Sequence, residues 1–150
     1  MFKHVLVPVD GSEHAARAVD IASDLVAHYG AKLTLIHVLT RAGGDRVPEG
    51  LESYAEIEHM RITEQDVIAS VGREILAKAK TRARAKGATD CTTLLESGDP
   101  TQQIAQAVKN GGVDLIVTGR RGLGDLGGLL LGSVSHKVAQ AVDCCCLTVK

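Results

Sequence analysis

The sequence predicts an α/β fold: a single-domain, doubly wound parallel sheet of five strands with helices on both faces. Short apolar runs typical of buried parallel strands alternate with longer stretches of helical periodicity along the chain. Strands that alternate with helices in this way pair in parallel through right-handed crossovers. No repeat or low-complexity tract divides the 150 residues, a length that suits one domain with a sizeable core. We therefore expect residues 1–150 to form one domain.

The first half of the chain predicts a strand, a helix and a second strand. His4–Val9 is a compact apolar run, and residues 10–12 (Asp-Gly-Ser) form a turn after it. Apolar residues then recur at helical spacing until Gly30, which stops the helix. Lys32–Leu39 is the second strand, and residues 40–55, with three glycines and a proline, predict a long loop.

The second half continues the alternation. A helix with an apolar residue at every fourth position runs to Lys86. Asp99 is a good cap for the next helix, because a proline and a glutamine follow at the first and third helical positions. The last helix begins near Ser133. The three remaining strands are Cys91–Leu95, Val113–Thr118 and Cys144–Val149.

Charge and hydropathy exclude several classes of function. Seventeen basic and 18 acidic residues give a formal net charge of −1, so the protein has no excess of positive charge that would attract nucleic acid or an anionic membrane. The basic residues between Lys78 and Lys86 are predicted to be the solvated end of a helix, where cations are favoured. The N-terminal apolar run is too short for a signal peptide, and no stretch approaches the roughly 18 apolar residues of a membrane span. We expect a cytoplasmic protein.

Cysteine and histidine are more simply structural than catalytic. Cys91 and the run Cys144-Cys145-Cys146 are predicted to be reduced packing thiols. Adjacent residues of a strand point to opposite faces, so the three consecutive thiols cannot surround one metal ion. His37 lies inside a predicted strand with no acidic partner at a fixed spacing, which favours a core or edge histidine.

The most informative segment is the glycine-dense loop between the fourth strand and the last helix. Glycines let consecutive backbone N–H groups approach an anion closely, and a helix N-terminus adds free donors and partial positive charge. In doubly wound sheets ligands bind beyond the carboxyl ends of the strands, where the strand order reverses. The loop is therefore predicted to bind a polyphosphate. Of its two arginines, Arg121 is favoured over Arg120 as the residue that contacts phosphate.

Two familiar glycine motifs do not describe this loop. Gly122, Gly124 and Gly127 fit the dinucleotide pattern G-x-G-x-x-G, but they follow the fourth strand and not the first. The helix also opens only near Ser133, whereas the dinucleotide pattern leads directly into a helix. The P-loop pattern is absent, since no lysine follows Gly127-Gly128.

The better pattern is Gly119-x2-Gly122-x9-Gly132-Ser133, and with it the chain resembles the universal stress protein family. The segments that carry the resemblance span nearly the whole chain. They are VLVPVDGSEHAARAVDIASDLVAHYGAKLTLIHVL, Gly98-Asp99-Pro100, VDLIVTGRRGLGDL and LLLGSVSHKVAQAV. The glycine spacing is similar to the ATP-binding branch of that family. The last strand departs from the family pattern, because Cys144-Cys145-Cys146 stands where the family usually has Cys-Pro.

The resemblance implies a homodimer through the C-terminal strand, strand order 3-2-1-4-5, and one ATP per subunit between the first and fourth strands. By position, Pro8 and Val9 would line the adenosine, Val38 would touch adenine, and Asp10 would offer a carboxylate to ribose or to Mg²⁺. The residues implied around the phosphates are Gly119, Gly122, Gly132, Ser133, Val134 and Ser135. Two alternatives come from the residues themselves. One is that Asp10 belongs to an ordinary strand-to-helix turn in which Asp10 or Ser12 caps the helix, and the other is that Ser133 caps the last helix.

The function implied is a cytoplasmic, ATP-binding stress protein that acts as a nucleotide-dependent sensor or regulator for a protein partner. We find no general-base constellation and no lysine or arginine finger at a fixed spacing, which favours binding with little turnover. One alternative is a slow Mg-dependent ATPase or phosphotransfer enzyme that uses Asp10, Ser12 and the metal. Another is a dimeric interaction module that does not bind nucleotide.

Overall fold

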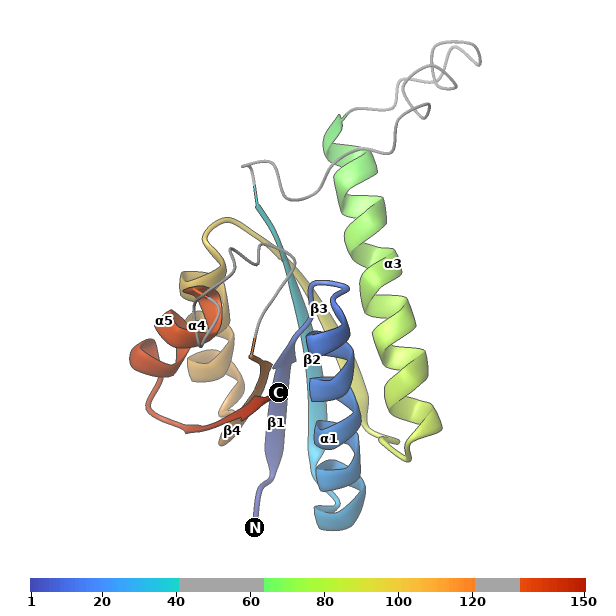
Figure 1. The fold of residues 1–150 in the computed structure, drawn as a ribbon, viewed down its shortest axis with the longest axis vertical. Coiled ribbons are helices and arrows are strands. Elements are labelled where there is room, and N and C mark those ends of the chain that lie inside the picture. The colour runs from blue at the N-terminus through green and yellow to red at the C-terminus, as the bar shows by residue number, and fades with distance from the viewer. Residues whose placement is uncertain (41–63, 121–132) are drawn as a thin grey trace.

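The structure, a computed structural model, describes residues 1–40, 64–120 and 133–150. Its centre is a sheet of five parallel strands in the order β3-β2-β1-β4-β5 (Figure 1). The predicted fold class and the strand order implied by the resemblance are both confirmed. The strands are β1 (His4–Pro8), β2 (Lys32–Leu39), β3 (Cys91–Ser97), β4 (Leu115–Gly119) and β5 (Cys145–Val149).

Helices cover both faces of the sheet (Figure 1), and in the described residues each face has two. Helix α1 (Glu13–Tyr29) and helix α3 (Glu64–Ala85) pack on one face, which we call the α1 face. Helix α4 (Pro100–Gly111) and helix α5 (Ser133–Ala141) lie on the other, the α4 face. None of the helices in the described ranges is long and apolar enough to cross a membrane.

Two aliphatic clusters, one on each face, form the core. Because strand residues alternate between faces, Val5 and Val7 join the cluster under α1 and α3, whereas Leu6 joins the cluster under α4 and α5. Asp114 anchors the beginnings of β1 and β4, since its carboxylate accepts the backbone N–H groups of Lys3 and His4 at 2.8 and 3.2 Å. The predicted fourth strand therefore begins two residues late, at Leu115.

The ends of the helices follow the predicted capping signals. Ser12 caps α1 by accepting the N–H of Ala15 at 3.2 Å, and Asp99 caps α4 by accepting the N–H of Gln102 at 2.9 Å. Gly30 ends α1 with φ 64°, a left-handed conformation that favours glycine. Local sequence signals were sufficient to predict these boundaries.

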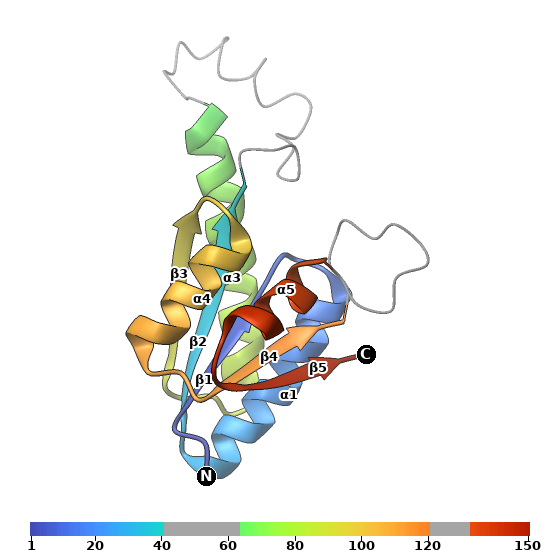
Figure 2. The ribbon, with the colours of Figure 1, turned by 90° about the vertical axis from the view of Figure 1, so that its left-hand side faces the viewer.

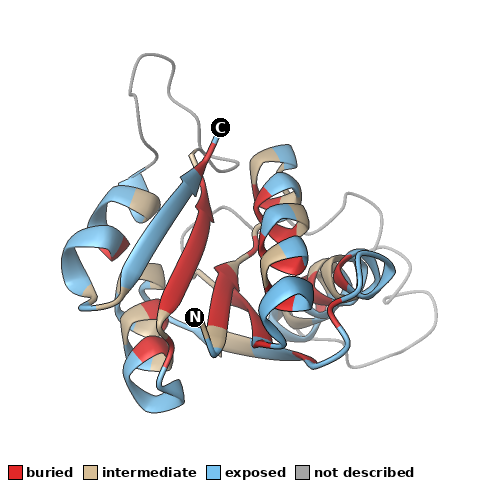
Figure 3. Cartoon of the chain, turned by 90° about the horizontal axis from the view of Figure 1, so that it is seen from below, coloured by how far each residue is buried: buried red, intermediate tan, exposed pale blue. Residues whose placement is uncertain are grey.

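The cysteine prediction is confirmed in part. Cys91 is buried and Cys144 is half-buried, and burial raises the pKa of both thiols. Cys145 and Cys146, however, are exposed, so the prediction that they are packing thiols is wrong for the isolated chain. The reason is that β5 is an edge strand, exposed over four of its five residues (Figure 3).

The basic end of α3 is not uniformly solvated. Arg82 forms a bidentate ion pair with Asp20 of α1, with Nε 2.6 Å from Oδ1 and Nη2 2.7 Å from Oδ2. The hydrogen bond from Arg82 holds the pKa of the Asp20 carboxyl below its ordinary value of 3.8. This pair ties the two helices of the α1 face together.

The end of β4 approaches the first turn of α1 very closely. A Cβ added to Gly119 would lie 2.7 Å from the carbonyl carbon of His14 and 2.8 Å from its oxygen. Both atoms belong to the backbone, so neither can rotate away. Only glycine fits this contact between a strand end and a helix start.

We predict that Asp20→Asn lowers the free energy of unfolding at about pH 7 by about 0.5–1 kcal/mol, since the pair is partly exposed and screened by solvent. Because folding lowers the Asp20 pKa, its contribution is present above the ordinary value of 3.8 and is lost as pH falls through the folded-state value. Urea unfolding at about pH 7 and about pH 2.5 measures this difference. Glu74→Gln, in the exposed Glu74–Lys78 pair, is the control. A pH-independent loss in Asp20→Asn would contradict the prediction.

We predict that Gly119→Ala lowers the free energy of unfolding by about 1–3 kcal/mol, because the first turn of α1 must shift to make room. Gly111→Ala is a matched control in a helical backbone: its Cβ would meet two side chains and no backbone atom, the His4 ring at 3.3 Å and Cγ2 of Val113 at 3.6 Å. The control should change stability by less than about 1 kcal/mol. Equal unfolding free energies for the two variants in urea would refute the packing argument.

Candidate functional site

The candidate site lies where the order of the parallel strands reverses. From β1 the chain crosses to β2 on one side, and later returns to β4 on the other side of β1. The carboxyl ends of β1, β2 and β4 meet at one edge of the sheet, and α1 begins directly after β1. This is the usual place for a ligand in a doubly wound fold.

The backbone at the end of β1 is fixed by β2. Val9 is buried, its N–H donates to the carbonyl of Ile36 at 2.8 Å, and its carbonyl accepts a hydrogen bond from Nδ1 of His37 at 2.7 Å. The prediction that His37 is a core histidine is confirmed, since it is 4% exposed. Because both backbone groups of Val9 have partners in β2 and its side chain belongs to the core cluster of the α1 face, Val9 holds the end of β1 in place.

Asp10 is held in a turn between β1 and α1. Its Oδ1 accepts the backbone N–H of Ser12 at 2.9 Å, and Gly11 between them has φ 84°. The alternative interpretation of Asp10 as a turn residue is thus confirmed. The same hydrogen bond orients the half-buried carboxylate at the edge where the strands end. A turn role and a ligand role are compatible for a side chain with two acceptor oxygens.

The ends of β4 and the beginning of α5 are joined by a side chain. The hydroxyl of Ser135 donates to the carbonyl of Gly119 at 2.8 Å. Ser133 and Val134, in the first helical turn, are exposed. That turn carries backbone N–H groups without intrahelical acceptors, together with the positive end of the helix dipole. Of the predicted phosphate residues, Gly119, Ser133, Val134 and Ser135 are therefore brought together.

Three other predicted residues, Arg121, Gly122 and Gly132, lie outside the described residues. Pro8 and Val38 are half-buried at the ends of β1 and β2. Val38 packs against the core cluster of the α4 face, so it borders the site from that side. Together with Val9 these residues form the apolar part of the site.

Two buried side-chain nitrogens, one in the residue after β4 and one in the first turn of α1, have no hydrogen-bond partner within the part of the chain that the structure describes. They are Nε of Arg120 and Nδ1 of His14. The backbone of Arg120 is fixed by its N–H bond to the carbonyl of Val149 at 2.6 Å. A buried polar group without a partner costs about 1–3 kcal/mol, so such groups at a ligand site point to a missing acceptor.

Sequence reasoning missed His14 altogether and favoured Arg121 over Arg120. No local signal marks His14, which reads as an ordinary residue in the first turn of a helix. Its place in the site comes from the contact between that turn and Gly119. Only the three-dimensional packing of α1 against β4 brings His14 to the end of that strand.

The residues fit a nucleotide by several independent features. The site combines apolar side chains, one oriented carboxylate, a helix N-terminus and a guanidinium. Within the described ranges no three His, Cys, Asp or Glu side chains are grouped as ligands of one metal ion. Mg²⁺ is commonly bound by only one or two protein carboxylates, and substrate phosphates and water supply its other ligands. Asp10 alone could therefore serve as the protein ligand.

Comparison with known proteins agrees with this geometry. The family model described as "Universal stress protein family" matches residues 1–150. The universal stress protein YxiE of Bacillus subtilis (strain 168) is 36% identical over 153 residues, which cover all of both chains.

Two solved structures share the fold. A crystal structure of a universal stress protein in complex with cAMP has a TM-score of 0.69 and 30% identity, covering 99% of this chain and 97% of that one. The universal stress protein from Archaeoglobus fulgidus in complex with dAMP has a TM-score of 0.68 at 21% identity, covering 100% and 98% of the two chains. Because the family model and a full-length relative agree over the whole sequence, this chain belongs to the universal stress protein family.

Proposed function

We propose that this protein binds ATP at the ends of β1 and β4 and acts as a nucleotide-dependent regulator. The observation that carries the proposal is the pair of buried, unpartnered nitrogens of Arg120 and His14 beside Gly119. They adjoin the first turn of α5, whose backbone N–H groups also favour an anion. The cAMP complex of a relative at 30% identity supports an adenine nucleotide as the ligand.

In this proposal the apolar and polar halves of the site have different tasks. Pro8, Val9 and Val38 would contact the adenosine, and Asp10 would bind the ribose or hold a Mg²⁺ ion that neutralises phosphate charge. The first turn of α5 and the cations bind the phosphates. The phosphate residues proposed are Gly119, Arg120, Arg121, Gly122, Gly132, Ser133, Val134 and Ser135.

Regulation without substantial turnover is part of the proposal. This part rests on the sequence, which shows no general-base constellation and no lysine or arginine finger at a fixed spacing. The nucleotide would then act by biasing the conformation that a protein partner reads. A cytoplasmic location, where ATP is abundant and three consecutive thiols stay reduced, is also proposed.

We predict that the purified protein carries or binds an adenine nucleotide and that Arg120→Ala weakens ATP binding by about tenfold, the loss of one charged hydrogen bond. Calorimetry with ATP and Mg²⁺ measures the affinity, and mass spectrometry of the small molecules released on denaturation identifies any bound nucleotide. Arg73→Ala, which removes an exposed arginine of α3, is the control and should bind as the parent does. Undiminished binding by Arg120→Ala would exclude Arg120 from the site.

We further propose a homodimer through β5. The N–H of Cys145 and the carbonyl of Val149 bond to the β4 side, so the backbone groups of the alternate residues Cys146 and Thr148 face the outer edge. An antiparallel pair that uses all of these outward groups has its two-fold axis at Leu147. That arrangement opposes the two Leu147 side chains, each 37% exposed in the single chain.

We predict that Thr148→Pro gives monomers that keep the parent fold, because it removes only an outward N–H group. Leu147→Pro is the matched comparison: its N–H faces β4, so the substitution should also destabilise the sheet. Light scattering at micromolar concentration measures the mass, and urea unfolding measures stability. A dimer that persists in Thr148→Pro, or a parent that is monomeric, would refute the β5 interface.

A further inference from the structure

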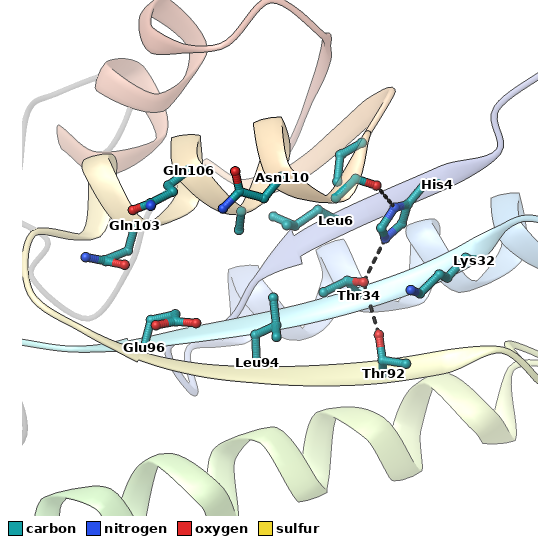
Figure 4. Close-up of a pocket in the computed structure, with 13 residues that line it drawn as sticks. His4, Leu6, Lys32, Thr34, Thr92, Leu94, Glu96, Gln103, Gln106 and Asn110 are labelled. Atoms are coloured by element: carbon teal, nitrogen blue, oxygen red, sulfur yellow. Dashed lines mark hydrogen bonds between the residues drawn. The ribbon is translucent and has the colours of Figure 1, made fainter.

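A second feature lies on the α4 face of the sheet, where its Glu96 end borders Val38 of the nucleotide site. It is a groove of about 400 Å³ between α4 and the strands β2 and β3 (Figure 4). The groove exists because α4 packs over the middle of the sheet, while β3 at the edge is left mostly exposed (Figure 2). We call it the β3 groove.

The floor of the β3 groove is unusually polar for a sheet face under a helix. Nε2 of His4 lies 2.8 Å from Oγ1 of Thr34, which lies 3.1 Å from Oγ1 of Thr92. Nδ1 of His4 donates to the carbonyl of Gly111 at the end of α4, 2.9 Å away. This chain of hydrogen bonds fixes the floor across three strands, and Leu94 adds an apolar position that is 36% exposed.

One wall of the groove consists of primary amides. Gln103, Gln106 and Asn110 stand at positions i, i+3 and i+7 of α4 and line the groove. Their side chains form no hydrogen bond with any other described residue. Each amide both donates and accepts, so this wall can hydrogen-bond polar side chains that a bound segment directs onto the α4 face.

The lining residues at the two ends of the groove carry opposite charges. Glu96 lies at the carboxyl end of β3, and Lys32 lies at the start of β2. The register places the exposed Asp90 beside Lys32 on the neighbouring strand. At about 3.3 Å per residue, the six residues from 90 to 96 span about 20 Å. Neither Glu96 nor Lys32 forms an ion pair with another residue of the described ranges. An occupant of matching length would be positive near Glu96, and at the other end its carboxylate would have to contact Lys32 while avoiding Asp90.

The edge beside the groove has unpaired backbone groups. The carbonyl of Asp90 and the N–H of Gly98 bond to β2, so the alternate residues Thr93, Leu95 and Ser97 direct their N–H and carbonyl groups outward. In β3, CTTLLES, no proline or lysine protects this edge. A strand edge next to a helix-walled groove is the arrangement that binds peptides by strand addition.

We propose that the β3 groove binds an extended segment of a partner protein, which adds to β3 as an antiparallel strand. Directly opposed residues of an antiparallel pair share a face, so the segment's alternate side chains meet Glu96, Leu94 and Thr92 in turn. The groove therefore selects the pattern basic–x–apolar–x–acidic. The basic residue meets Glu96, the apolar residue covers Leu94, and Lys32 reaches the acidic residue with its flexible stem.

Fluorescence anisotropy with two labelled peptide pools tests this proposal. One pool carries the pattern basic–x–apolar–x–acidic, and the other exchanges the two charges. We expect saturable binding of the first pool, at least tenfold weaker binding of the second, and reversed preference in the double variant Lys32→Glu, Glu96→Lys. Thr93→Pro, which removes an outward N–H group, should abolish binding. Thr93→Ala should retain it, because the side chain lies on the opposite face.

Several outcomes would overturn the proposal. They are no saturable binding of either pool up to about 1 mM, equal affinity for both pools, or full binding by a folded Thr93→Pro variant. If Thr93→Pro instead dissociates an oligomer of the parent, the occupant of the edge is a second copy of this chain and not a partner peptide. ATP binding by Thr93→Pro is measured by calorimetry as well. A variant that binds ATP as the parent does but does not bind the peptide has lost the β3 groove alone and not the nucleotide site.

Discussion

The contact between Gly119 and the first turn of α1 is the constraint on which the site depends. Because a side chain at Gly119 would overlap the backbone of His14, the strand end and the helix start are held at a fixed separation. That separation places the His14 ring beside β4 and leaves Arg120 directly after it. The bond from Ser135 to the carbonyl of Gly119 then draws the first turn of α5 to the same point. One glycine thus positions three elements around the proposed phosphates.

The two edges of the sheet form a second theme. Both edge strands are short, parallel to their neighbours and largely exposed, and neither β3 nor β5 contains the lysine or proline that commonly protects an edge. Their outward backbone groups belong to alternate residues, which defines the register that any added strand must take. On β5 the proposed addition is symmetric and centred on Leu147. On β3 the opposite charges of Lys32 and Glu96 give the groove a direction, which favours a different partner.

The proposed nucleotide and peptide sites share the central strands and meet at one point. The nucleotide site lies at the carboxyl ends of β1, β2 and β4, whereas the β3 groove extends along β2 and β3 to His4 at the start of β1. They adjoin where Val38 pairs with Glu96. Helix α4, whose amides line the groove, is packed against α5, whose first turn belongs to the nucleotide site. A nucleotide that shifts α5 would therefore act on the wall of the groove through a direct helix contact.

The sequence by itself determined the alternating elements, the helix caps at Ser12, Asp99 and Gly30, and the strand ends that carry the glycine loop, because these depend on residues close together in the chain. Tertiary structure alone decided which side chains meet: Arg82 with Asp20, His14 with Gly119, and His4 with Thr34. It also decided that Cys145 and Cys146 are exposed, since exposure depends on β5 being an edge strand. Local patterns encode backbone conformation, but contacts between distant residues depend on how the helices pack on the sheet, and no spacing along the chain records that.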